Sequence, residues 1–259
     1  MPYYKTDDGV RLYYSLRGHG APTYVFVHGW CSRSSDWDAQ LRFFGRRSRV
    51  LAVDRRGHGR SDRPDGGYSA KRHAEDLMGI LRRERVRRAV VVAHAGGAPT
   101  ALELAAREPE RVRAMVLIDT RIGPAADLDD PKDPAGSAYR EMVDGLLGRN
   151  GTRAFARMYG ALFSPHAGPA GRRALANALE TPVEIAGAEL ASLAIDTQGL
   201  ARKVRAPVLW LTAGAEDEAA IASAFRNVQF GQTVGSGHFP QLEVPDQVNA
   251  MIARFVATL

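Results

Sequence analysis

Short apolar runs at regular intervals are the feature of this sequence that most restricts its fold. The runs are TYVFV at 23–27, RVLAV at 49–53, AVVV at 89–92, AMVLI at 114–118, VLWL at 208–211 and a short sixth one at 227–230. Continuous apolar, β-branched segments of this length indicate strands that are buried on both faces, as in parallel sheets covered by helices. The sequence therefore predicts an α/β fold with a mostly parallel sheet flanked by helices.

Between these runs, apolar residues recur with helical spacing. The pattern predicts helices over 37–44, 70–83, the segment that ends before Pro109, and 245–257. The first 18 residues alternate large and polar side chains around a DDG turn, which predicts a β-hairpin. The carboxyl ends of all the parallel strands then meet at one edge of the sheet, where open α/β folds bind ligands.

The alternation of strands and helices breaks between Asp119 and Ala206. Residues 121–135 are rich in Asp, Pro and Gly, which predicts a loop. Amphipathic patterns then predict about four helices, near 137–148, 152–163, 169–180 and 182–194. We expect a core formed by 1–120 and 201–259, with 121–200 inserted as a helical lid above the ligand-binding edge.

Composition excludes several classes of protein. With 45% hydrophobic and 25% charged residues, the chain is neither disordered nor membrane-embedded by composition. The net charge of +6 comes from scattered arginines without an aromatic platform, so we expect no nucleic-acid partner. No apolar run reaches the length of about 20 residues that a membrane helix needs. The first residues do not have the pattern of a signal peptide. Together these two observations predict a cytoplasmic protein. The single cysteine, Cys31, excludes an intramolecular disulfide and a cysteine-based metal cluster, and we interpret it as a buried filler.

Five motifs stand where predicted strands end. They are HGW at 28–30, DRRGHGRSD at 54–62, AHAGG at 93–97, GAED at 214–217 and GSGHF at 235–239. In this order the chain resembles the α/β-hydrolase superfamily over nearly its full length, and its motifs are most similar to those of bacterial serine esterases and perhydrolases. The resemblance implies an α/β-hydrolase fold with a lid and a small-molecule substrate. The glycine pattern matches neither GxGxxG nor GxxxxGK[ST], so we expect no nucleotide cofactor, and the sequence carries no signal for a metal or a flavin. It does not determine the oligomeric state.

In this superfamily the residue that corresponds to position 95 is the nucleophile. It lies at a sharp turn, and the residues next to it must be small. This chain has Ala95 there, and a methyl group cannot attack a carbonyl carbon. Either a serine has been replaced by alanine, or the natural chain works without a nucleophile. Because AHSGG would be a common form of the motif, we favour replacement. Gly96 and Cys31 stand where enzymes with an aspartate nucleophile usually carry Trp and Pro, which makes serine the better reconstruction.

The resemblance also implies the partners of the nucleophile. His238 in GSGHF is the expected general base, and a carboxylate must hold it in one tautomer. We prefer Asp217 for this role, with Asp119 as the alternative acid. The backbone N–H groups of Trp30 and Gly96 are the expected oxyanion-hole donors.

The remaining candidates concern substrate binding and the other histidines. We expect substrate-binding side chains at Trp30, Phe155, Met158, Tyr159, Phe163 and Phe239, although part of this apolar set, with Leu162, can simply pack the lid onto the core. His28, His58 and His94 are interpreted as structural, and no partner for His73 or His166 is visible in the sequence.

Three functions remain open. The first is a hydrolase of an ester, lactone or thioester of a small apolar substrate, which works by Ser-His-Asp acyl transfer and is disabled here by Ala95. The second is a cofactor-independent dioxygenase similar to those of 3-hydroxy-4-quinolones, which depend on a His/Asp pair whose acid follows the run at 114–118; this would select Asp119. The third is a non-catalytic ligand-binding protein, which would have no need for His238 and its acid.

Overall fold

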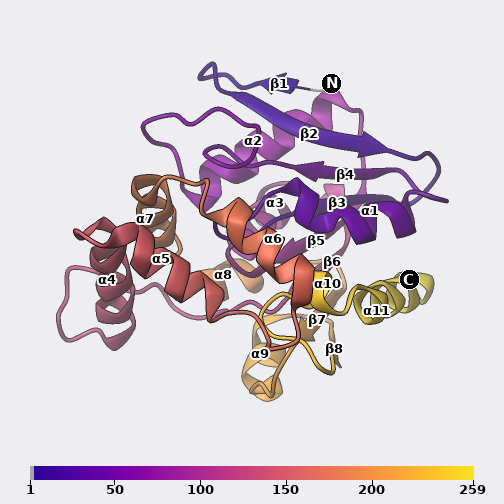
Figure 1. Cartoon of the computed structure of the whole chain (residues 1–259). Coiled ribbons are helices and arrows are strands. Elements are labelled where there is room, and N and C mark those ends of the chain that lie inside the picture. Colours follow the sequence, from indigo (N-terminus) through magenta and orange to yellow (C-terminus); the bar gives the residue numbers. More distant parts are fainter. Residues whose placement is uncertain (1–2) are drawn as a thin grey trace.

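The computed structural model describes residues 3–259, and its central feature is a twisted sheet with helices on both faces (Figure 1). The strands are β1 (Tyr3–Lys5), β2 (Arg11–Arg17), β3 (Thr23–Val27), β4 (Val50–Val53), β5 (Ala89–His94), β6 (Val112–Ile118), β7 (Val208–Thr212) and β8 (Val228–Gln232). Their spatial order is β1-β2-β4-β3-β5-β6-β7-β8. The hairpin β1–β2 is antiparallel, as is the pair β2–β4, and all other pairs are parallel. The predicted mostly parallel sheet is confirmed; Met1 and Pro2 of the predicted hairpin lie outside the described residues.

The flanking helices lie close to their predicted positions. They are α1 (Asp38–Phe44), α2 (Ala70–Arg83), α3 (Ala98–Arg107) and α11 (Pro245–Ala257). Three short helices were not predicted: α8 (Thr197–Ala201), α9 (Glu218–Ala224) and α10 (Pro240–Glu243). Each has seven residues or fewer, which is too short for a helical repeat to be recognised in the sequence.

Alternate side chains of each strand pack against opposite layers of helices. In β5, Val91 and Ala93 belong to the apolar cluster that includes α2 and α3, whereas Val90 and Val92 belong to the cluster with α1 and α11. This alternation follows from the two-residue repeat of a strand. Every residue of β5 is buried as a result, which explains why its sequence is continuously apolar up to His94.

A group of helices is inserted between β6 and β7. It comprises α4 (Pro134–Leu147), α5 (Gly151–Gly160), α6 (Gly168–Ala178) and α7 (Val183–Ser192), each within a few residues of a predicted helix. Figure 1 shows these four helices together, beside and in front of the sheet. We call α4–α7 the cap. Trp30, in the loop after β3, donates a hydrogen bond from Nε1 to the carbonyl of Ala186 in α7 at 2.8 Å, so the cap contacts the carboxyl edge of the sheet.

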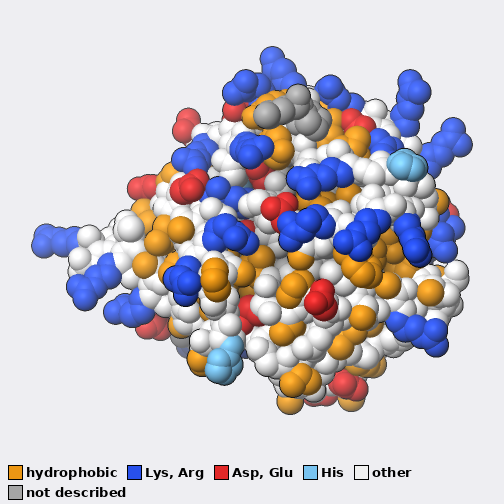
Figure 2. All heavy atoms as spheres, turned by 45° about the vertical axis from the view of Figure 1, so that its right-hand side comes forward, with side chains coloured by type: hydrophobic (Ala, Val, Ile, Leu, Met, Phe, Trp, Pro, Cys, Tyr) orange, Lys and Arg blue, Asp and Glu red, His pale blue; other side chains and the backbone are white. Residues whose placement is uncertain are grey.

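The surface carries its basic side chains in a dispersed arrangement. On the face in Figure 2, lysine and arginine side chains are spread over much of the surface among apolar and acidic ones. Among residues 3–259, no helix combines the length and the apolar character needed to cross a bilayer.

The turn between β5 and α3 leaves no room for a side chain at Gly97. A Cβ atom there would clash with the carbonyl oxygen of His28 and lie 2.9 Å from that of Val27, both of them backbone atoms that cannot rotate away. We therefore expect Gly97→Ala to lower the free energy of unfolding by about 1–3 kcal/mol, measured by urea denaturation. Gly145→Ala is the matched control, because nothing lies within 4 Å of that position on α4, and it should stabilise the chain by about 0.5–1 kcal/mol. Equal effects of the two changes would contradict this view of the turn.

Candidate active site

Ala95 occupies a strained turn. It directly follows β5 with φ of +44°, in the left-handed region that non-glycine residues rarely adopt. Its carbonyl oxygen accepts a hydrogen bond from Oγ1 of Thr120 at 3.0 Å, which connects the turn to the loop after β6. The sharp strand-to-helix geometry of a nucleophile elbow is therefore present, with a methyl group at its tip.

His238 and Asp119 come together from distant parts of the sequence. His238 follows β8 and Asp119 follows β6, and Nδ1 of His238 lies 2.6 Å from Oδ2 of Asp119. The other carboxylate oxygen accepts a hydrogen bond from the backbone N–H of Ala213 at 2.9 Å. Although burial would raise the pKa of Asp119, the hydrogen bonds from His238 and Ala213 hold it below its ordinary value. The carboxylate thus stays charged and fixes the proton of His238 on Nδ1, which leaves Nε2 as a proton acceptor.

The preference for Asp217 as the acid is wrong. Its side chain is exposed and accepts a hydrogen bond from the amide of Ala220 at 3.0 Å, so Asp217 caps the start of α9. The alternative, Asp119, is the carboxylate that meets His238. Both residues follow strands at the same edge of the sheet, and only the path of the chain after each strand decides which one turns toward the histidine.

Trp30 and Gly96 lie side by side, as expected for two oxyanion-hole residues. The backbone nitrogen of Trp30 is 3.2 Å from the position that a Cβ atom of Gly96 would take. Within residues 3–259, the N–H of Trp30 has no hydrogen-bond acceptor. Leu193, just after α7, is also in contact distance of Gly96, at 3.3 Å from the same Cβ position. The N–H of Trp30 therefore lies at the boundary between the elbow and the cap.

His94 supports the loop that carries His238. Its Nε2 lies 2.7 Å from the carbonyl oxygen of His238, and the two imidazole rings are 4.8 Å apart between centroids. Burial, reinforced by the nearby His238, lowers the pKa of His94 to about 3, so its ring is neutral and Nε2–H donates to that carbonyl. This arrangement agrees with a structural role for His94.

Aromatic side chains from the cap and the core meet above the elbow. Phe155 and Tyr159 are almost fully buried, and the ring of Trp30 lies 5.2 Å from Phe155 and 6.0 Å from Tyr159 between centroids. Phe163 stacks on Phe239 at 4.4 Å. Met158, Leu162 and Phe163 are only partly buried. Phe155 and Tyr159 therefore hold the cap in place, whereas Trp30, Met158 and Phe163 retain surface that a substrate can contact.

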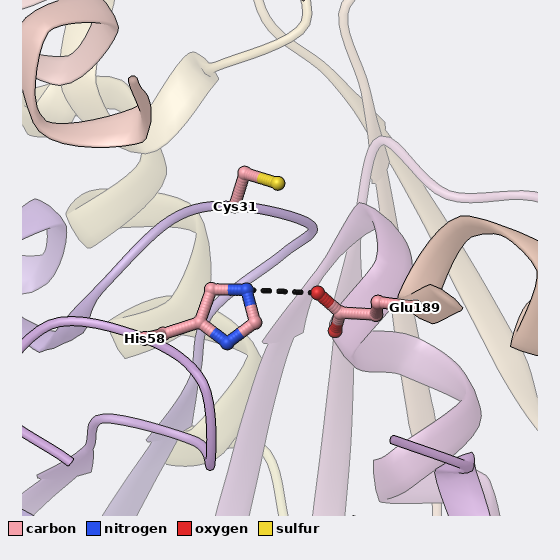
Figure 3. Close-up of side chains that lie close together, drawn as sticks. All are labelled: Cys31, His58 and Glu189. Carbon is pink, nitrogen blue, oxygen red and sulfur yellow. Dashed lines mark ion pairs between the residues drawn. The ribbon is translucent and has the colours of Figure 1, made fainter. Parts of the chain in front are cut away.

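A buried charged cluster lies between the cap and the core, and the sequence did not predict it. Glu189 of α7 is fully buried and contacts the guanidinium of Arg55. One of its carboxylate oxygens lies 2.8 Å from Nε2 of His58 (Figure 3), and the other lies 3.8 Å from Nε2 of His73. We call Arg55, His58, His73 and Glu189 the Glu189 cluster. The signal that would have found it is an acidic residue among the apolar residues of α7, where Ile185, Ala186 and Leu190 are buried.

The same cluster has some geometric features of a metal site. Potential ligand atoms of Cys31, His58 and Glu189 lie within 4.8 Å of one another. However, burial and the charge of Glu189 raise the pKa of the Cys31 thiol well above its ordinary value, so it is protonated and a poor ligand. A metal ion would also meet the positive charge of Arg55 among almost fully buried side chains. We therefore interpret the cluster as a closed ion network.

Comparison with known proteins identifies the family. Residues 22–245 match the family model of the alpha/beta hydrolase fold, so the chain belongs to this family. The chain is similar to the bifunctional esterase/perhydrolase DCH of Acinetobacter calcoaceticus, with 37% identity over 48% of this chain and 46% of that protein. It is also similar to a 2-heptyl-3-hydroxy-4(1H)-quinolone dioxygenase of Mycobacteroides abscessus, with 32% identity over 55% of each chain. The aligned part spans about half the length of these curated relatives.

The fold extends over the whole described chain. A thermophilic esterase from Thermogutta terrifontis superimposes with a TM-score of 0.86 over 99% of this chain and 98% of that chain, at 23% identity. The predicted α/β-hydrolase fold is thus confirmed, and relatives of the family include esterases, lactonases and haloperoxidases.

Three neutral buried histidines make the stability of the chain sensitive to acid. Burial lowers the pKa of His94 to about 3 and holds those of His28 and His73 well below the ordinary value. Below a pH of about 6.5 the unfolded chain therefore binds protons that the folded chain does not, and stability falls as the pH falls. Burial raises the pKa of Asp36 to about 6 and also raises the pKa values of Asp76 and Glu216, and these groups oppose the trend. Carboxylates whose pKa values are lowered, such as Glu108 and Asp119, add to it.

We expect the unfolding temperature to drop between pH 7.5 and pH 5.5, followed by circular dichroism. His94→Gln retains a donor for the carbonyl of His238 and should reduce the pH dependence, whereas His166→Gln, at an exposed position, should leave it unchanged. An unfolding temperature that is constant or rises on acidification would contradict the assignment of neutral buried histidines.

Proposed function

We propose that this chain is an enzyme of the α/β-hydrolase fold that works without a nucleophile, by general-base catalysis on an aromatic hydroxyl substrate. The observation that carries the proposal is the intact His238–Asp119 pair beside an alanine at position 95. A pure binding protein needs no base held by a carboxylate, and acyl transfer through a covalent intermediate needs a nucleophile that Ala95 does not provide. Proton abstraction requires only the pair.

The reaction we favour is that of a cofactor-independent dioxygenase acting on a 3-hydroxy-4-quinolone. Nε2 of His238 would take the hydroxyl proton, and Asp119 would stabilise the imidazolium that forms. The resulting electron-rich anion would react directly with O₂. The two ring C–C bonds to the hydroxyl-bearing carbon would break, both oxygen atoms of O₂ would enter the ring-cleaved N-acylanthranilate, and the excised carbon would leave with its own oxygen as carbon monoxide. This chemistry uses no metal or organic cofactor.

Two further observations support this assignment. The acid follows β6, which is the position expected for this type of dioxygenase, and one relative of the chain is a quinolone dioxygenase. The N–H of Trp30 would donate to the substrate oxygen on which negative charge develops. The aromatic surfaces of Trp30 and Phe163 suit a flat apolar substrate, and the apolar surroundings favour O₂ over water.

Acyl transfer is the second candidate, because the elbow and the neighbouring Trp30 and Gly96 retain the geometry of a hydrolase, and the esterase/perhydrolase is a relative. In this interpretation, the chain is a hydrolase of an ester, lactone or thioester that has lost its serine. The two candidates differ in whether the chain as it stands is active.

The first test is oxygen consumption with a 2-alkyl-3-hydroxy-4-quinolone. We expect the unmodified chain to consume O₂, and Asp119→Asn to lower kcat about 10²- to 10⁴-fold, because His238 loses the acceptor that holds its tautomer. Asp217→Asn is the matched control and should retain full activity, since asparagine also caps a helix. Equal activity of the Asp119 and Asp217 variants would rule out the pair as the base.

The second test restores the nucleophile. Ala95→Ser should introduce hydrolysis of p-nitrophenyl acetate and labelling by a fluorophosphonate, since a serine hydroxyl would then stand at the elbow beside the base. If the unmodified chain ignores the quinolone while Ala95→Ser hydrolyses esters efficiently, the acyl-transfer candidate replaces the dioxygenase. Tight quinolone binding without either activity would indicate a ligand-binding protein.

A further inference from the structure

The peptide unit between Gly29 and Trp30 is held through its carbonyl oxygen. This oxygen accepts hydrogen bonds from Nη2 of Arg55 at 2.8 Å and from Nδ1 of His28 at 2.8 Å, and the amide of Ser32 donates to it at 3.3 Å. The peptide is trans, so its C=O and N–H point in opposite directions in one plane. The groups that hold the carbonyl of Gly29 therefore also set the direction of the N–H of Trp30, which lies beside Gly96.

The proton on His28 is determined by its neighbours. The backbone N–H of Arg55 donates to Nε2 of His28 at 2.9 Å, so the ring proton is on Nδ1 and is donated to the carbonyl of Gly29. Burial holds the pKa of His28 well below its ordinary value, which keeps the ring neutral. This donor belongs to the core and does not depend on the cap.

Arg55, in contrast, depends on the cap. Its side chain is only 2% exposed, and a buried guanidinium requires a counter-charge. The carboxylate of Glu189, on α7, contacts the guanidinium. His58 fixes its other oxygen at 2.8 Å (Figure 3). Although burial would raise the pKa of Glu189, Arg55 and His58 hold it well below its ordinary value, so the counter-charge persists.

We infer that Arg55 and Glu189 are positioning residues that couple the docking of the cap to the orientation of the Trp30 N–H. Glu189 holds the guanidinium of Arg55 on the carbonyl of Gly29, and the peptide plane then directs the N–H toward the substrate oxygen that becomes negatively charged. If α7 moves away, Arg55 loses its counter-charge and the donor loses one of its anchors. The indole of Trp30 is bound to Ala186, one turn earlier on α7, so the same helix contacts the ring as well. This inference rests on the proposed function for its substrate.

The sharpest variant is Arg55→Lys. Lysine keeps a positive charge opposite Glu189, but an ammonium group cannot reproduce the fork that reaches both Glu189 and the Gly29 carbonyl. We expect kcat for quinolone turnover to fall about tenfold to hundredfold, with little change in KM, because the lost interaction acts on the charge that develops in the reaction.

The matched control is Glu180→Gln. It breaks another ion pair between the cap region and the core, Arg33–Glu180 at 2.9 Å, which does not touch the Gly29–Trp30 peptide. We expect this variant to retain the kcat of the unmodified chain. A similar loss in Glu180→Gln and Arg55→Lys would mean that cap attachment in general, and not this peptide, determines the rate.

A second variant separates positioning from stability. Glu189→Gln leaves a buried guanidinium without a counter-charge and is prone to unfold, whereas Arg55→Met combined with Glu189→Leu removes both charges and fills the space with apolar groups. We expect this double variant to unfold at or above the temperature of the unmodified chain but to remain as slow as Arg55→Lys. Recovery of full kcat together with stability would overturn the inference.

A measurement on the free protein makes the test independent of the substrate. The chain contains three tryptophans, so ¹⁵N-tryptophan labelling yields few backbone amide signals. We expect the Trp30 amide resonance to shift in Arg55→Lys and in the double variant, and to stay unchanged in Glu180→Gln. An unmoved Trp30 amide would refute the positioning role. If the Trp30 amide shifts but the chain neither binds nor turns over the quinolone, only the proposed function is refuted. The kcat for p-nitrophenyl acetate in the Ala95→Ser background would then report on the Trp30 N–H.

Discussion

The hydrogen bond between His238 and Asp119 depends on the parallel sheet, because the two residues are 119 positions apart in the sequence. β6 and β8 end at the same edge, with β7 between them. β7 and the turn after it also fix the acid directly: the amide of Asp119 donates to the carbonyl of Leu211 at 2.7 Å, and the amide of Ala213 donates to its carboxylate. A carboxylate held by a neighbouring strand has little freedom to leave the histidine, so the pair is preorganised for the proposed proton transfer.

The elbow keeps its geometry although its tip has no nucleophile. A non-glycine residue in the left-handed region costs about 1–2 kcal/mol, and the chain adopts it at Ala95 and again at Asp119, with φ of +44° and +43°. Strain of this kind persists where the surrounding structure determines the backbone strongly. The close packing of Gly97 on the loop after β3 provides this constraint. The features retained at the site are the His238–Asp119 pair and the neighbouring Trp30 and Gly96, and the proposed reaction requires these and no nucleophile.

The cap contributes more than an apolar cover. Its aromatic residues pack on Trp30 and Phe239, which gives a surface suited to a flat substrate, while Glu189 introduces a charge into the interior. A buried carboxylate is destabilising unless it is paired, and here its partners Arg55 and His58 belong to the core motif DRRGHGRSD. The motif that is usually recognised for its glycine-rich turn thus also anchors the cap, and through Arg55 it reaches the peptide that carries the Trp30 amide.

The sequence by itself determined the sheet, the flanking helices, the helical insertion and the position of the elbow. Runs such as 89–92 are apolar throughout because both faces of the strand are covered, and this local pattern is readable without coordinates. Only the tertiary structure decided which carboxylate meets His238, because Asp119 and Asp217 both follow strands at the same edge and differ in the path of the following loop. It also brought Glu189 into contact with Arg55 and His58, which lie 134 and 131 positions earlier in the sequence. The sequence could not predict this contact, because a contact between a cap helix and a distant core loop leaves no periodic signal in either segment.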